Sequence, residues 1–413
     1  MKRAIVLSGG GARGAYQIGV WKALRKLNIK YDIVTGTSVG ALNGALMTQN
    51  TYYRGLWFWY NIKVKNVFST DSMGEINIKE KETALYKKCA KAISKDHGLD
   101  ASNLSKTIDI ALDEERFRKS KIDYGLITVN LTTKKPIKIT KNEIPKGKLN
   151  DYLMASAACY PAFKTKTIDD EEYIDGAYYD NLPINLAASM GATEIIAVDL
   201  KSLGIRRRLK YDNVKVTYIT PRNKLGFLLS FHKYYARRGM RLGYNDAMKT
   251  FKKLDGDKFT FKHGDLDSNY KKYKEEYQNN LNKLKTKKKD NILEKVFKIT
   301  NKNEIDIRKF NKTIEFLGKT FDLDDSLIYN IRIFNKKISY RMMKMEHIDK
   351  KLIKQKIKDM DLKCLFNNKN IIKYIYDELN ACNNSKYNKT LSNLSLLFPK
   401  EFLGALYLYI IQK

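Results

Sequence analysis

The sequence predicts an α/β domain, with a mainly parallel central sheet flanked by helices, followed by an all-α C-terminal region. Short apolar runs alternate with helical periodicity through the first 200 residues, the pattern of a parallel sheet. From about residue 223, glycine thins out, lysine and asparagine increase, and helical periodicity dominates. We therefore expect one domain over residues 1–265 and a basic helical region over residues 270–413, with a basic linker near residues 285–289.

The composition indicates an intracellular protein with a sizeable core. The chain has 413 residues, of which 43% are hydrophobic. The four cysteines lack C-x-x-C spacing, and the first apolar run breaks at Ser8-Gly9, too early for a signal peptide. The longest apolar run, residues 402–411, is half the length of a membrane-spanning helix. We expect a cytoplasmic location with peripheral membrane contact.

The net charge of +33 is unevenly distributed. Residues 1–200 carry +7 and residues 201–413 carry +26. Solvated lysine-rich faces would explain the excess, and so would attraction to an anionic membrane. Nucleic acid is not expected, because no zinc-finger or RNP pattern is present. The sequence does not indicate an oligomeric state.

The first fifty residues form a compact strand–loop–helix–strand–turn–helix pattern. Residues 3–7 are a β-branched strand, a glycine loop follows, and helical spacing runs from Ala15 to Leu27. The loop also matches G-x-G-x-x-G through Gly9, Gly11 and Gly14, which opens a dinucleotide-binding alternative. That alternative needs an acidic residue at the end of the second strand, whereas Asp32 begins it.

The second strand leads into Gly36-Thr37-Ser38-Val39-Gly40, a G-x-S-x-G sequence before a helix of small residues. In this context the pattern is typical of a nucleophile elbow, a sharp turn that exposes a serine hydroxyl. Gly36 and Gly40 relieve crowding in the turn, and the helix N-terminus favours developing negative charge. A plain glycine-rich turn is the alternative. Ser38 is the candidate nucleophile.

A serine nucleophile needs a positioned base. The four histidines (His97, His232, His263 and His347) do not follow sheet strands with turn glycines. Asp175, at the end of a short strand and followed by Gly176-Ala177, is the candidate base, with a simple turn aspartate as the alternative. An aspartate with an ordinary pKa near 3.9 is a poor base, so the site must keep it dry.

The glycine loop supplies a third part of the candidate site. Backbone amides of Gly9, Gly10 and Gly11 can stabilise an oxyanion, at about 3 kcal/mol per donor. Arg13 then contacts a substrate phosphate, maintains the loop or is a surface cation.

Further elements are expected along the domain. The aromatic run 52–60 is a core helix or a cover over an acyl-binding cleft. The remaining expectations are helices over 81–95, 104–112 and 149–158, a strand over 125–130 paired with 137–139, and strands over 195–198 and 214–219.

The glycine loop, the elbow and the D-G-A turn, in this order, resemble the patatin-like phospholipases. The resemblance covers about residues 3–200 and weakens toward 265. It implies a variant of the α/β-hydrolase fold with a Ser38–Asp175 dyad, without histidine, cofactor or metal. Gly9, Gly10 and Gly11 would supply oxyanion donors, with Arg13 and Gly14 beside them and Gly36, Gly40 and Gly176 as turn glycines.

The implied activity is hydrolysis of carboxylic esters in phospholipids or other acyl lipids through an acyl-serine intermediate. This is the chemistry of a phospholipase A or a lysophospholipase. The alternative from another class is a non-catalytic protein that binds a membrane or partner on a hydrolase scaffold.

Overall fold

The computed structural model describes residues 2–68, 87, 90–91, 93–94, 98–284, 306–345, 368–382 and 387–413. Its contacts divide the chain into two compact units, Met1–Phe251 (unit 1) and Lys252–Lys413 (unit 2). The linker expected at 285–289 lies outside the described residues, as does most of the helix expected over 81–95.

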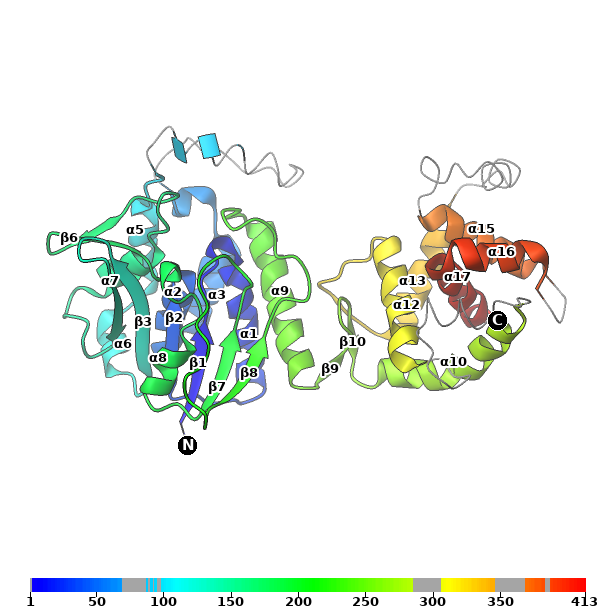
Figure 1. Cartoon of the computed structure of the whole chain (residues 1–413), viewed down its shortest axis with the longest axis horizontal. Helices are drawn as coiled ribbons and strands as arrows, with labels where there is room; N and C mark the ends of the chain where they lie inside the picture. The colour runs from blue at the N-terminus through cyan, green and yellow to red at the C-terminus, as the bar shows by residue number, and fades with distance from the viewer. Residues whose placement is uncertain are drawn as a thin grey trace. The chain divides into compact units, whose positions relative to one another are not determined.

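The sheet of unit 1 confirms the predicted α/β fold with mainly parallel strands (Figure 1). Its order is β5-β6-β3-β2-β1-β7-β8, and β4 pairs with β3. The four pairings among β3, β2, β1, β7 and β8 are parallel, and the pairings that involve β4, β5 and β6 with their neighbours are antiparallel. The strands are β1 Arg3–Leu7, β2 Ile33–Thr37, β3 Asp123–Asn130, β4 Lys135–Thr140, β5 Lys166–Ile168, β6 Glu171–Asp175, β7 Glu194–Val198 and β8 Lys215–Ile219.

Helices cover both faces of this sheet. A β-carbon at Gly44 of α2 would approach Val34 and Tyr124, whereas the cluster around α8 contains Ile33 and its neighbours of the same pleat. Because adjacent strand residues point to opposite faces, α2 and α8 lie on opposite sides. The helices of unit 1 are η1 Gly11–Gly14, α1 Ala15–Lys26, α2 Val39–Thr48, α3 Tyr52–Asn61, η2 Val64–Asn66, α5 Ser102–Ala111, α6 Glu114–Lys119, α7 Leu149–Ala157, η4 Gly176–Tyr178, α8 Ile184–Ser189 and α9 Lys233–Thr250.

Strand β3 organises the part of the sheet that matters for the site. β4 pairs with 125–130 of β3, as the sequence predicted, and therefore occupies one edge of β3. The other edge is shared end to end by β2, which pairs with 123–127, and β6, which pairs with 128–130. Thr37 faces Ile127 and Asp175 faces Thr128. The ends of β2 and β6 are thus brought together by consecutive residues of one strand.

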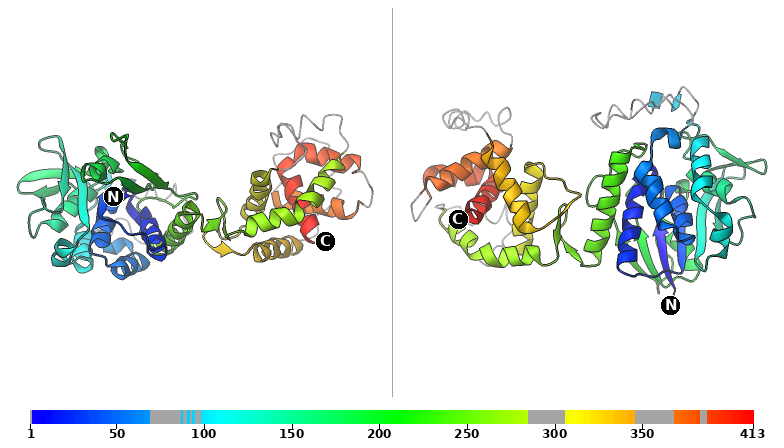
Figure 2. Two further views of the ribbon diagram at one scale, coloured as in Figure 1. Left: turned by 90° about the horizontal axis from the view of Figure 1, so that it is seen from below. Right: turned by 180° about the vertical axis from the view of Figure 1, so that it is seen from behind.

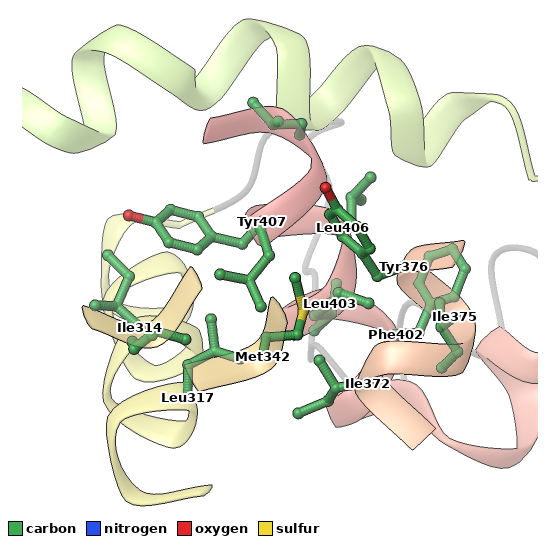
Figure 3. Packing of buried hydrophobic residues seen from close by; sticks show 14 of the residues in the cluster. Ile314, Leu317, Met342, Ile372, Ile375, Tyr376, Phe402, Leu403, Leu406 and Tyr407 are labelled. Carbon is green, nitrogen blue, oxygen red and sulfur yellow. The ribbon is translucent and has the colours of Figure 1, made fainter. Parts of the chain in front are cut away.

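Unit 2 is largely helical and has its own core. Figure 3 shows Phe402, Leu403 and Leu406 of α17 pointing toward side chains from α12, α13 and α15, and these residues are buried. The apolar run 402–411 is therefore a core helix. The helices are α10 Asp265–Asn282, α12 Ile307–Thr320, α13 Ile331–Met343, α15 Asn368–Asn380, α16 Lys389–Leu397 and α17 Pro399–Ile411. No helix in the described part of the chain is long and apolar enough to cross a membrane.

Unit 2 differs from the expected all-α region in two ways. It contains a small sheet in which β10 (Thr260–Lys262) pairs antiparallel with β9 (Leu254–Asp255) and parallel with β11 (Ile328–Tyr329). It also begins at Lys252, earlier than the expected boundary near 265–270. The reason is packing, since Phe261 and Leu266 belong to the hydrophobic cluster of unit 2.

The unit boundary also redistributes the charge. Residues 201–251 contain 13 lysines and arginines against two acidic residues, and they belong to unit 1. Residues 252–413 contain 36 basic and 21 acidic residues. The basic excess of the second half of the sequence is therefore divided between both units.

Candidate active site

Ser38 lies between β2 and α2 in a backbone conformation that few side chains adopt. Its φ is 57° and its ψ is −131°. The glycines on either side are required by close approach: a β-carbon at Gly36 would lie 2.3 Å from the Gly40 carbonyl oxygen, and one at Gly40 would lie 2.2 Å from the Leu7 carbonyl oxygen. The chain therefore passes through a crowded turn that presents the serine at the helix N-terminus.

Ser156 holds the backbone of Ser38, a contact that sequence reasoning missed. The amide of Ser38 donates to Ser156 Oγ at 2.9 Å, and Ser156 Oγ donates to the Ile127 carbonyl at 2.7 Å. Ser156 lies on α7 and is fully buried. A small polar residue on an otherwise apolar helix face was the only signal that could have found it.

Asp175, 137 positions after Ser38 in the chain, is brought beside it by the register of β3 described above. The carboxylate is 2% exposed and accepts a hydrogen bond from the Ala177 amide at 2.8 Å. Burial raises the pKa of the Asp175 carboxyl to about 7, while hydrogen bonds from the Ala177 amide and the Ser38 hydroxyl act in the opposite direction. The aspartate is thereby kept dry, as the sequence required of a base.

Gly176 allows β6 to end against β3. A β-carbon at this position would lie 2.1 Å from the Ile127 carbonyl oxygen and 3.0 Å from Thr37 Cγ2. Any side chain would push Asp175 away from the elbow. The glycine after the aspartate is thus explained by close approach, since its φ is not positive.

The glycine loop lies against Ser38, but its three amides are not equivalent. A β-carbon at Gly9 would lie 3.0 Å from Ser38 Cβ. The Gly9 amide, expected as an oxyanion donor, instead donates to Asn181, at 3.0 Å to Oδ1 and 3.2 Å to the carbonyl. This corrects the expectation for Gly9. Among the hydrogen bonds of the described residues, the amides of Gly10 and Gly11 donate to none.

Arg13 anchors the glycine loop. Its Nε donates to the Gly226 carbonyl at 2.9 Å, so the loop-maintaining role is the one with a contact in the structure. Gly14 lies deeper, where a β-carbon would lie 2.4 Å from Val39 Cγ2, and its carbonyl accepts from Asn43 at 3.0 Å. These contacts fix the loop relative to α2.

An apolar pocket of about 640 Å³, a figure that includes its solvent-open part, adjoins Ser38. It follows α2 past Leu42 to Leu46, eight residues beyond the serine and therefore roughly 12 Å along the helix. Its other lining residues are Gly11, Val39, Asn43, Phe58, Trp59, Val67, Leu104, Ile108, Ala111, Leu112, Ala157, Phe163 and Phe231. Helix α3 both packs on the core and lines this pocket, so the two interpretations of the aromatic run are compatible.

The histidines that the structure describes have local partners. His232 precedes α9, where its Nδ1 accepts from the Tyr234 amide at 3.1 Å, and His263 of unit 2 lies 3.0 Å from Asp255 Oδ1. His97 and His347 lie outside the described residues. No cluster of three or more potential metal ligands occurs in the described ranges.

The dinucleotide alternative receives no support from the placement of Asp32. Its carboxylate accepts from the Arg3 amide at 2.8 Å. Arg3 begins β1, whereas the glycine loop follows the other end of that strand. Asp32 therefore lies at the opposite end of the strands from the glycine loop, where its carboxylate cannot reach a ribose bound at the loop.

Burying Asp175 should cost stability in a pH-dependent way. A folded-state pKa of about 7, above the value of 3.8 for a free carboxyl, means that the cost of burying Asp175 is absent below about pH 4, grows as the pH rises to about 7 and is complete above it. We expect Asp175→Asn to stabilise unit 1 by roughly 1–4 kcal/mol at pH 8 and to change little at pH 4.

Tryptophan fluorescence during unfolding measures this effect, because all three tryptophans (Trp21, Trp57 and Trp59) belong to unit 1. Asp170→Asn, at an exposed carboxylate, is the matched control. A variant less stable than the wild type at pH 8 would contradict the assigned cost of burial.

Comparisons with known proteins place part of the chain beside one family of sequences. Residues 5–188 match the family model described as patatin-like phospholipase. Patatin-like phospholipase domain-containing protein 7 of Rattus norvegicus is 29% identical over 201 residues, which cover 48% of this chain and 14% of the relative. Protein 6 of the same description, from Homo sapiens, is 27% identical over 201 residues, which cover 48% and 13%. The chain thus spans only a small part of these curated relatives.

Among solved structures, VipD from Legionella pneumophila aligns over 99% of this chain and 91% of its own, at 14% identity with a TM-score of 0.39, too low for a functional comparison. The family assignment depends on the sequence match, which covers the glycine loop, the elbow and the D-G-A turn together. Over residues 5–188 the chain therefore matches a patatin-like phospholipase domain.

Proposed function

We propose that unit 1 is a lipid acyl hydrolase that cleaves carboxylic esters through an acyl-serine intermediate. One observation carries the proposal: Ser38 and the buried, hydrogen-bonded Asp175 meet beside an apolar pocket that extends away from the serine. An apolar pocket suits a fatty acyl chain, since burial of each methylene group contributes about 0.8 kcal/mol.

In the proposed reaction, Ser38 Oγ attacks the ester carbonyl carbon while its proton passes to the Asp175 carboxylate. The amides of Gly10 and Gly11 would donate to the oxyanion, together with Val39, whose amide opens α2. When the tetrahedral intermediate collapses, the carbon–oxygen bond to the alcohol breaks and the alcohol takes the proton from Asp175. Water then attacks the acyl-serine and gives a proton to Asp175. The bond between the acyl carbon and Ser38 Oγ breaks, the fatty acid leaves, and Asp175 returns the proton to Ser38 Oγ.

The burial of Asp175 supports its assignment as base. A carboxylate with an ordinary pKa would be mostly ionised but too weak to draw a proton from serine. A pKa of about 7 makes the group a stronger base that is still ionised at and above neutral pH. Ser156, Gly36 and Gly176 would act as positioning residues, because they hold the serine and the aspartate without touching the substrate.

Replacement of either dyad residue should abolish hydrolysis of a chromogenic short-chain ester. We expect Ser38→Ala and Asp175→Asn to lower kcat/KM by at least about 10³-fold. In the wild type, kcat/KM should fall as the pH is lowered through about 7, because the Asp175 carboxyl becomes protonated. Stopped assays over a pH series measure both effects.

A histidine base would give a similar pH profile, so the control is replacement of all four histidines. Retained turnover agrees with a Ser–Asp dyad, and collapse on changing one of them would indicate a hidden triad. Undiminished turnover in Ser38→Ala would overturn the proposal. Vesicle binding without turnover of any ester would favour the non-catalytic alternative.

The pocket should set the acyl-chain preference. Leu46→Phe adds bulk at the far end of the pocket, where it would exclude about two methylene groups of a long acyl chain. Their loss would cost about 1.6 kcal/mol, so the ratio of kcat/KM for palmitoyl over hexanoyl esters should fall roughly tenfold. Leu46→Ala is the matched variant and should shift the preference the other way. An unchanged ratio in both variants would show that this pocket does not bind the acyl chain.

We also propose that the positive charge of the protein attracts it to anionic membranes. Binding to vesicles that contain anionic lipid should weaken as salt rises from about 0.05 to 0.5 M, because exposed charges are screened. Sedimentation with vesicles measures the bound fraction. Equal binding to neutral and anionic vesicles would remove this electrostatic account.

A further inference from the structure

Helix α3 presents two different apolar faces. Phe58 and Trp59 point inward and line the pocket next to Ser38. On the outer side, Tyr53, Trp57 and Tyr60 are 73%, 62% and 46% exposed. Their spacing of four and three residues places them on one side of the helix. We call these three side chains the outer aromatic face of α3.

Arginines from neighbouring helices stack on this outer aromatic face. The guanidinium carbon of Arg25 on α1 lies 5.4 Å from the centre of the Tyr53 ring, and that of Arg237 on α9 lies 3.7 Å from the centre of the Tyr60 ring. Figure 2 (right) shows α1, α3 and α9 side by side on unit 1. Both ends of the face therefore combine an aromatic ring with a permanent positive charge.

The helices around the face carry almost no negative charge. Residues 15–26 and 52–66, which include α1, α3 and η2, contain no aspartate or glutamate. Helix α9 has one acidic residue, Asp246, which is buried and paired with Lys249 at 3.0 Å. The exposed cations on these elements include Lys22, Arg25, Lys26, Arg54, Lys63 and Lys65.

We propose that the outer aromatic face of α3 docks on the surface of an anionic lipid bilayer. Tyrosine and tryptophan favour the boundary between headgroups and acyl chains, and the surrounding cations complement acidic headgroups. This inference deepens the proposed function, since the bilayer would supply the acyl lipid. Because one helix carries both faces, docking brings the Ser38 pocket within about one helix diameter, roughly 10 Å, of the lipid.

This assignment differs from attraction through unit 2. A basic unit alone would bring the protein near a membrane without burying any part of α3. Insertion of the outer aromatic face requires Trp57 to leave water. The chain has three tryptophans, and the other two, Trp21 and Trp59, are buried, so Trp57 is the one that a bilayer can newly cover.

The test uses the full chain with Ser38→Ala, which prevents lipid turnover, and vesicles of phosphatidylcholine with about 30% phosphatidylserine. Insertion of Trp57 into the bilayer should shift the tryptophan emission to the blue, because the indole leaves water. Brominated acyl chains in these vesicles should quench the same emission. The additional substitution Trp57→Phe should abolish both changes. Sedimentation of the protein with vesicles while the Trp57 emission stays unchanged would overturn the proposal, and would assign membrane contact to another surface.

A second measurement links docking to turnover. In the wild-type background, Tyr53→Ser with Trp57→Ser should weaken vesicle binding roughly tenfold and reduce hydrolysis of vesicle lipid, while hydrolysis of a soluble short-chain ester stays unchanged. Tyr211→Ser is the matched control, because Tyr211 is exposed and precedes β8 beside Asp212. Equal vesicle binding by the double variant and the control would contradict the proposal, whether or not the esterase assignment holds.

Discussion

The pairing of β3 is the constraint on which the rest of the candidate site depends. With β4 along one edge, β2 and β6 must share the other, so that Thr37 and Asp175 face consecutive residues of β3. The serine follows Thr37 directly, and the aspartate ends β6. A shift of one residue would turn the Asp175 side chain to the opposite face of the sheet. Gly176 and Ser156 protect this register, one by omitting a side chain and the other by tying the Ser38 amide to Ile127.

The burial that would make Asp175 a useful base also lowers the free energy of unfolding when the carboxyl is ionised. Within the described part of the chain, hydrogen bonds from the Ala177 amide and the Ser38 hydroxyl offset part of the desolvation of the carboxylate. Packing of the surrounding strands and of the α1, α2 and α8 helices must compensate for the stability that is lost by burying this carboxylate. Such a loss of stability is common where a titratable group is placed for chemistry and not for packing.

Helix α3 connects the interior of unit 1 to its surface. Tyr52, Gly55 and Trp59 pack inward, Trp59 donates to Asn43 on α2 at 2.9 Å, and the opposite side carries exposed aromatic rings. The ten residues of α3 therefore include aromatic side chains of two kinds, some buried in the core and others exposed on the surface. The division of basic residues between the two units places positive charge beside this helix as well as in unit 2.

The sequence by itself determined the strand–loop–helix–strand–turn–helix order that opens unit 1, the elbow at Ser38, and the candidate base at Asp175, because each depends on local periodicity or on glycines in fixed positions. Only the tertiary structure decided which glycine-loop amides are unpaired among the described residues, since Asn181, which accepts from the Gly9 amide, is 172 positions away. It also revealed Ser156, the apolar pocket beside Ser38 and the unit boundary at Phe251. These features arise from contacts between distant segments, which no local pattern encodes.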